Sequence, residues 1–152
     1  LELRGCKGQL LDRLTLQGAL ARLDPVPLRG APAPTYLVSV DLTADAGSYN
    51  GPLTLPIEVV KNHLKPASAR TPKGKLEPIR LALTGKAQWK KAPLRNVDDL
   101  LSVSSQPRNE GFITYYRRYH PTPQGWQLKV RCEAGMWESD GEFPETSRFP
   151  SR

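Results

Sequence analysis

Proline is the residue that most limits how this chain can fold: 15 of its 152 residues are proline, and they are spread from residue 25 to residue 150. Proline has no backbone N–H and breaks helix interiors, and within sheets it is confined to edges, strand ends and bulges. We therefore expect short strands joined by stiff loops, without long helices. A chain of this length can form one domain with a buried core.

Segment 78–91, PIRLALTGKAQWKK, alternates between apolar and polar positions up to Gly85. The apolar residues lie two positions apart and point to one side: Ile79, Leu81 and Leu83. This period is typical of a half-buried strand, and Gly85 indicates a bend or bulge in it. Beyond Gly85, a tryptophan lies among lysines: Lys86, Trp89, Lys90 and Lys91.

The same alternation predicts further strands over 14–25, 35–44 and 52–60, and a hairpin formed by 111–120 and 125–134. A short helix is predicted over 96–103, with Asn96 as its N-cap and Asp98 and Asp99 in its first turn. We expect one helical turn at 59–65 and a long polar loop at 65–78. The sequence thus predicts a mainly β fold: an OB-like barrel of five to six strands, one or two short helices and an additional C-terminal hairpin.

The charge of the chain is positive and uneven. At +7, with an isoelectric point near 9.6, it favours an anionic partner such as nucleic acid, a membrane surface or an acidic protein. Residues 1–132 hold 20 bases and 10 acids, whereas residues 133–152 hold 2 bases and 5 acids. We therefore divide the chain into one domain, 1–134, and an acidic tail, 135–152. We expect the tail to be poorly packed and to offer a site for a protein partner.

Two segments combine cations with aromatic rings, which suits a protein that holds single strands through their phosphates and unstacked bases. The first contains Lys86, Trp89, Lys90 and Lys91. The second is the C-terminal hairpin, with Tyr115, Tyr116, Arg117, Arg118, Tyr119, Lys129 and Arg131. The loop at 65–78 adds Lys73 and Lys75, and Glu77 is the one acid against nine bases in residues 61–91. We predict these thirteen residues as the nucleic-acid contacts.

Each of these signals also has a purely structural interpretation. Tyrosines on a strand commonly pack on the sheet with their hydroxyl groups at its rim, and arginines commonly form a solvated face. For the hairpin both interpretations stay open. Trp126 lies on an apolar face and is assigned to the core, whereas the lysines around Trp89 favour a surface position. His63 and His120 are expected at the surface.

The phrase LQGALARLDP, residues 16–25, is followed after a loop by TYLVSVDL, residues 35–42. This order resembles the first strands of bacterial single-stranded DNA-binding proteins and their primosomal relatives. Segments 52–64 and 78–91 are similar to the third and fourth strands of that family, so the resemblance covers roughly residues 14–91. It implies an OB-fold, a five-stranded barrel that binds nucleic acid across one face, with Trp89 and its basic neighbours as binding residues. The third strand lacks the family's tryptophan, and the tail lacks its acidic-Pro-Phe end.

Other function classes lack the residues that they need. Cys6 and Cys132 are too few for a disulfide or metal framework, and the carboxylates Asp98, Asp99 and Glu110 lack the spacing of a metal-dependent nuclease. No Gly-rich phosphate loop and no nucleophile–base set is present. No apolar run is long enough for a membrane span, and the N-terminus has no signal region, so we expect the cytoplasm.

We therefore predict a non-catalytic protein, without cofactor or metal, that binds single-stranded DNA with low sequence specificity in replication, recombination or repair. Single-stranded RNA is the near variant, and a homo-oligomer is compatible with either. The alternative is a β-rich protein-interaction or assembly module, such as a phage accessory factor or an inhibitor, whose basic face docks an acidic partner.

Overall fold

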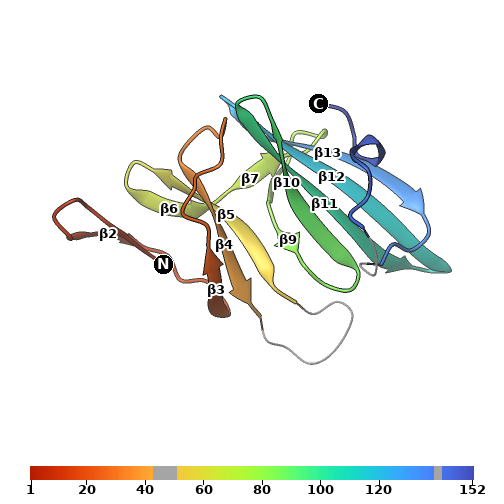
Figure 1. Ribbon diagram of the computed structural model, residues 1–152, viewed down its shortest axis with the longest axis horizontal. Helices are drawn as coiled ribbons and strands as arrows, with labels where there is room; N and C mark the ends of the chain where they lie inside the picture. The colour runs from red at the N-terminus through yellow and green to blue at the C-terminus, as the bar shows by residue number, and fades with distance from the viewer. Residues whose placement is uncertain (43–50, 139–141) are drawn as a thin grey trace.

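The computed structural model describes residues 1–42, 51–138 and 142–152, and the regular secondary structure of this part of the chain is almost wholly strand (Figure 1). The predicted mainly β fold is confirmed. The end of the strand predicted over 35–44 lies outside the described residues. A single 3-10 turn, η1 (Thr146–Arg148), follows the strands in the described part.

The strands form three sheets. The smallest pairs β1 (Glu2–Arg4) with β2 (Leu10–Arg13). A six-stranded sheet has the order β10 (Ala87–Leu94), β11 (Val97–Arg108), β12 (Gly111–Thr122), β13 (Gly125–Ala134), β7 (Ser68–Arg70), β8 (Leu76–Pro78). A five-stranded sheet has the order β3 (Ala19–Leu23), β4 (Thr35–Asp41), β5 (Leu53–Val60), β6 (His63–Pro66), with β9 (Leu81–Ala82) also paired to β5. The pairings of the described strands close no barrel.

The main core lies between the two larger sheets. Leu37 of the five-stranded sheet meets Leu100 and Trp126 of the six-stranded sheet there, and Ile79 and Leu81 are completely buried with them. Arg80 and Ala82 alternate with these residues, as the sequence predicts, but Leu83, predicted on the buried side, is 46% exposed because β9 ends at Ala82. At Gly85 the chain turns sharply into β10, closed by a hydrogen bond from the amide of Thr84 to the carbonyl of Ala87 (2.8 Å).

The C-terminal segment packs on the opposite face of the six-stranded sheet. Phe149 is 4% exposed, meets Tyr116 edge-on at 5.4 Å between ring centroids, and stacks on Phe143 at 5.5 Å. Trp137 joins the same cluster. The expectation of a poorly packed tail is wrong, because the acidic segment carries aromatic residues that bury apolar surface on the sheet.

The helix predicted over 96–103 is wrong, because residues 97–103 form part of β11 and Asn96 lies in the turn before it. Leu100, Leu101 and Val103 are all completely buried, because one face of β11 packs in the main core and the other lies under the C-terminal segment. A strand that is covered on both faces has a continuous apolar run, which periodicity alone does not separate from a helix.

Segment 65–78 is not a loop either. It contains β7 and β8, joined by a turn in which the amide of Gly74 donates to the carbonyl of Thr71 (2.8 Å). Ala67 and Ala69 are completely buried, and such small residues give little hydrophobic signal in the sequence. The helical turn expected at 59–65 is instead the tight turn between β5 and β6, with Lys61 and Asn62 at positive φ.

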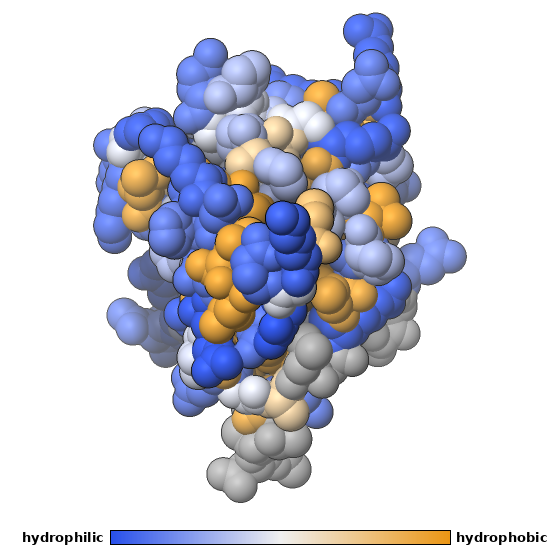
Figure 2. Space-filling view, turned by 90° about the vertical axis from the view of Figure 1, so that its left-hand side faces the viewer, coloured by the Kyte–Doolittle hydropathy of each residue, from blue (hydrophilic) through white to orange (hydrophobic). Residues whose placement is uncertain are grey.

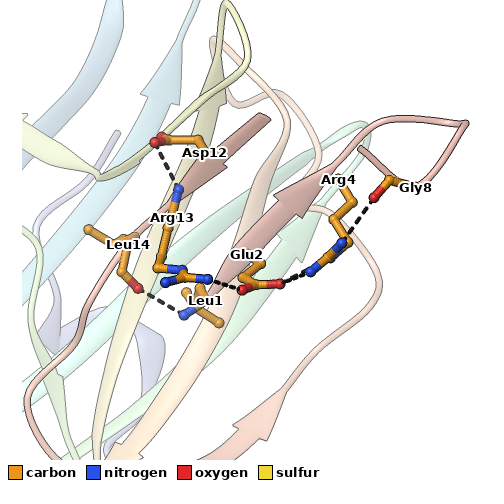
Figure 3. A network of polar contacts seen from close by, with 7 residues as sticks. All are labelled: Leu1, Glu2, Arg4, Gly8, Asp12, Arg13 and Leu14. Carbon is orange, nitrogen blue, oxygen red and sulfur yellow. Dashed lines mark hydrogen bonds and ion pairs between the residues drawn. The ribbon is translucent and has the colours of Figure 1, made fainter. Parts of the chain in front are cut away.

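The N-terminal hairpin of β1 and β2 projects from the rest of the fold (Figure 1). Glu2 binds both Arg4 (2.6 Å) and Arg13 (2.7 Å), and the amino group of Leu1 donates to the carbonyl of Leu14 (2.8 Å; Figure 3). An apolar hollow of about 470 Å³ lies between this hairpin and the five-stranded sheet, with Leu3, Leu23 and Tyr36 in its lining. Seen from this side, apolar patches alternate with polar ones (Figure 2).

Candidate functional site

One row of side chains crosses the six-stranded sheet from β10 to β12. Ser102 of β11 pairs with Trp89 of β10 on one side and with Arg117 of β12 on the other. Residues directly opposite each other in antiparallel strands point to the same face of the sheet. Leu100 and Tyr119, two positions along, belong to the main core. The side chains of this row therefore face the five-stranded sheet.

Arg117 and Ser102 line a polar hollow of about 340 Å³ between β11–β12 and segment 77–87. Its polar lining includes Arg80, Lys86, Ser102, Ser104, Arg117 and Tyr119, and Glu77 is its carboxylate. The hollow thus presents cations and hydroxyl groups together, and its formal charge is positive.

Arg117 is held firmly at this hollow. Its Nη1 donates to the Ser104 hydroxyl at 2.6 Å, and its guanidinium lies over the Tyr115 ring, 4.8 Å from the centroid. The Tyr115 hydroxyl in turn accepts from Arg108 at 3.2 Å. Within the described part of the chain, neither Arg117 nor Arg80 forms an ion pair with a carboxylate. Both guanidiniums are available to an anion.

Trp89, at the other end of the row, lines a second hollow of about 260 Å³. Arg22 of β3 and Lys91 of β10 line it too, and both are exposed. Trp89 itself is half-buried, packed against the main core along one side. Arg22 of β3 and Asp24, directly after β3, also line this hollow, and neither was among the residues predicted from the sequence. An aromatic ring and two cations from different sheets therefore meet at one edge of the fold.

Four of the thirteen predicted contact residues are buried, which corrects the expectation that they face solvent. They are Lys86, Tyr116, Arg118 and Tyr119. Lys86 forms an ion pair with Glu138, and Arg118 donates to Asp99 (2.6 Å) and to the carbonyl of Pro150 (2.6 Å). For the buried tyrosines, the structural interpretation is the right one. The C-terminal segment covers Tyr116 and Arg118, which the sequence did not reveal, whereas Tyr119 is buried in the main core on the inner face.

The remaining predicted residues lie on separate surfaces. Trp89, Tyr115 and Arg117 share the inner face with Lys91, whereas the Nζ of Lys90 lies over the Phe143 ring at 4.6 Å on the other side. Exposed cations occur elsewhere, on β13 and in the β7–β8 hairpin: Lys73, Lys75, Lys129 and Arg131. Of these, Lys75 lies 3.6 Å from Glu77 and Arg131 lies 3.0 Å from Glu133. The thirteen residues therefore do not form one continuous surface.

Two adjacent carboxylates tie distant segments to the start of β11. Asp98 binds Arg29 at 2.7 Å, and this hydrogen-bonded guanidinium lowers the pKa of Asp98 although burial opposes it. Asp99 is completely buried. Burial favours its neutral form, but hydrogen bonds from Arg152, His120 and Arg118 outweigh that effect and lower its pKa. Both acids therefore have structural roles, Asp98 as the partner of the exposed Arg29 and Asp99 as a partner of the buried Arg118.

Among the described residues, His, Cys, Asp and Glu side chains form no group of three that could hold a metal ion. Cys6 and Cys132 are free and exposed. None of the helical turns in the described residues has the length and apolar character needed to cross a membrane.

Comparisons of the chain with family models, with curated proteins and with solved structures found no match. The resemblance to bacterial single-stranded DNA-binding proteins stays a prediction from the sequence.

Proposed function

We propose that this protein binds single-stranded nucleic acid, DNA in the first place, without catalysis and with little sequence preference. The observation that carries the proposal is the row from Trp89 to Arg117, which gives an aromatic ring and a guanidinium without a carboxylate partner on one face. The two hollows on this face add Arg22, Arg80 and Lys91. We call this set, with Trp89 and Arg117, the inner basic face.

The inner basic face supplies both kinds of contact that a single strand needs. Cations hold the phosphates by displacing counterions, which makes the affinity dependent on salt. A half-buried tryptophan offers its ring to an unstacked base, and such a contact is worth about 1–3 kcal/mol for any base. The four cations of the inner basic face stand against two carboxylates that line the hollows, Asp24 and Glu77. Because none of these contacts reads a base edge, low sequence specificity follows.

The resemblance of residues 14–91 to single-stranded DNA-binding proteins supports the same function. In OB-folds, nucleic acid lies across the face of the sheet and its loops. The inner basic face is bounded by β3 and β10, each the terminal strand of its sheet. We propose that a single strand of nucleic acid enters along these two edges. Roles in replication, recombination or repair would follow from such binding.

Titration of the purified chain with a labelled oligo-dT over a salt series tests this function. We expect binding that weakens steeply as salt rises, and a weaker affinity for duplex DNA of equal length. Arg117→Gln and Lys91→Gln should weaken binding, whereas Lys7→Gln, which removes an exposed cation from the N-terminal hairpin, should not. Binding that is micromolar or weaker at low salt, without steep salt dependence, contradicts the proposal.

A second candidate is a protein-interaction module whose cations dock an acidic partner. It is favoured by the contacts of the C-terminal segment, in which Glu138 pairs with Lys86 and Phe143 lies under Lys90. Tryptophan fluorescence separates the two candidates. Oligo-dT should quench the emission of the wild type but not that of Trp89→Phe, whereas an acidic peptide should leave the emission of Trp89 unchanged. Quenching by the peptide alone favours the second candidate.

A further inference from the structure

The polar hollow beside Arg117 has the properties of a bounded anion pocket. It has a volume of about 340 Å³, and it lies between the inner face of β11–β12 and the segment that leads from β8 to β10. Arg117 approaches it from the sheet, and Arg80 approaches it from the opposing segment. Two guanidiniums from different parts of the chain therefore line one half-open hollow.

One of the two guanidiniums of this pocket, that of Arg117, is held in place before any ligand arrives. Arg117 is oriented by the Ser104 hydroxyl (2.6 Å) and by the Tyr115 ring (4.8 Å), so little side-chain entropy is left to lose. Arg80 is exposed and without an ion pair among the described residues. Lys86 already forms an ion pair with Glu138. It therefore adds positive charge to the pocket but is not a free hydrogen-bond donor.

Hydroxyl groups complete the lining. Ser102 is 4% exposed, and its hydroxyl has no hydrogen-bond partner among the described residues, although it lines the pocket. The Tyr119 side chain, likewise buried and without a hydrogen bond there, contributes a second hydroxyl. Glu77 is the one carboxylate of the lining, and Lys75 lies 3.6 Å from it. The pocket thus combines unused donors with a net positive charge.

We infer that this pocket binds a phosphomonoester, with Arg117 and Arg80 on its oxygens and the hydroxyls of Ser102 and Tyr119 as further donors. A monoester carries a charge of about −1.5 to −2 near neutral pH and three strong acceptor oxygens. An internal phosphodiester carries a single negative charge. Two convergent guanidiniums match the monoester better, since each can form a two-pronged contact.

Two sources supply this group: the terminal phosphate of a nucleic-acid strand, or a free mononucleotide. The pocket goes beyond the proposed function, because a free phosphomonoester fills it whether or not the inner basic face binds a strand. Preference for a phosphorylated strand end rests on the proposed function.

Calorimetric titration of the full chain tests the pocket with three small probes: inorganic phosphate, thymidine 5′-monophosphate and thymidine. We expect the first two to bind and thymidine to fail. Arg117→Gln and Arg80→Gln should each weaken binding at least tenfold, as loss of a charge-assisted contact does, while Arg117→Lys keeps the charge and loses part of the affinity. Lys7→Gln is the control for loss of one positive charge and should bind as the wild type does.

A second set of probes separates the two sources. Short oligo-dT with a 5′-phosphate, a 3′-phosphate or neither should show a tenfold preference for one phosphorylated end if the strand terminus is the source. Equal affinity of the three oligonucleotides, with binding of the monophosphate intact, assigns the pocket to a free nucleotide.

Absence of saturable monophosphate binding up to about 1 mM overturns the inference, as does wild-type affinity in Arg80→Gln. Arg80 is exposed, so this variant is expected to fold even if Arg117→Gln does not. Failure of the proposed function looks different: unphosphorylated oligo-dT then fails to bind, while the monophosphate still does.

Discussion

Trp89 and Arg117 lie opposite the same residue, Ser102, from the two strands that flank β11. Strands in a sheet are spaced by about 4.8 Å, so the backbones of the two residues are roughly 10 Å apart. Both side chains point toward the five-stranded sheet, and each lines a hollow that cations also line, Arg80 beside Arg117 and Arg22 with Lys91 beside Trp89. A base stacked on Trp89 and a phosphate bound by Arg117 can therefore belong to the same short stretch of one nucleic-acid strand.

Replacing the ring of Trp89 tests the stacking part of this arrangement. Trp89→Ala should lower the affinity for oligo-dT by about 1–3 kcal/mol, because each stacked base contributes roughly that amount. Trp89→Phe should lose less, since it keeps an aromatic face. Fluorescence anisotropy at constant salt measures the effect. Trp126→Phe is the control, since Trp126 is buried in the main core; equal losses in both variants would contradict stacking on Trp89.

The exposed cation Lys91 tests the electrostatic part. For a single strand, the slope of log K against log salt falls by about 0.7 for each phosphate contact that is lost. Lys91→Gln should therefore bind more weakly at low salt and show a slope smaller by roughly this amount. Lys7→Gln should leave the slope unchanged. An unchanged slope in Lys91→Gln removes this residue from the binding face.

The C-terminal segment should contribute measurably to stability. Phe149 is buried between Tyr116 and Phe143, so Phe149→Ala removes packed aromatic surface and leaves a cavity. The expected loss is about 3 kcal/mol in the free energy of unfolding. Urea unfolding followed by circular dichroism gives the value. Val130→Ala, at an exposed position of β13, should cost far less; similar losses would mean that the segment is not packed on the sheet.

Asp99 should make the free energy of unfolding depend on pH in the acidic range. Its pKa is held below the ordinary value of 3.8 by hydrogen bonds from Arg152, His120 and Arg118, which outweigh burial. A carboxyl with a lowered pKa in the folded state stabilises the fold above its unfolded pKa. That contribution is lost as pH falls below 3.8 and through the folded value.

Asp99→Asn is therefore expected to cost about 3 kcal/mol at pH 7, because it leaves the buried Arg118 without its anionic partner. The difference from the wild type should shrink near pH 3, which is below the ordinary pKa of 3.8, because the carboxyl of the unfolded wild type is then largely protonated. Urea unfolding at both pH values measures it, with Glu110→Gln, an exposed position, as the control. A difference that is the same at both pH values would contradict this role.

The sequence predicted the strands whose two faces differ. β4, β5 and the hairpin of β12 and β13 show apolar and polar residues in alternation, and they form where the pattern places them. Around Asp99 the sequence predicted a helix instead of a strand. Because β11 is covered on both faces, apolar and polar residues do not alternate along it. At Ala67 and Ala69 the buried side chains were too small to mark strands at all.

The candidate site was only partly predictable for a related reason. Arg117 and Trp89 were identified from the mixture of cations and rings around them, but pairing through Ser102 depends on register, which two segments far apart in the sequence do not reveal. Arg22 reaches the site from the other sheet. Tyr116 and Arg118 were predicted at the surface, yet the C-terminal segment covers them through contacts such as Phe149 on Tyr116.

The measurement that tests the central claim most directly is the affinity for oligo-dT across a salt series. It compares the wild type with the single variants Trp89→Ala and Arg117→Gln and with the double variant that carries both substitutions. We predict submicromolar binding at low salt with a steep salt dependence, a loss in each single variant, and coupling between the two, since both contact one strand. Weak binding without salt dependence, or full wild-type affinity in the double variant, would contradict it.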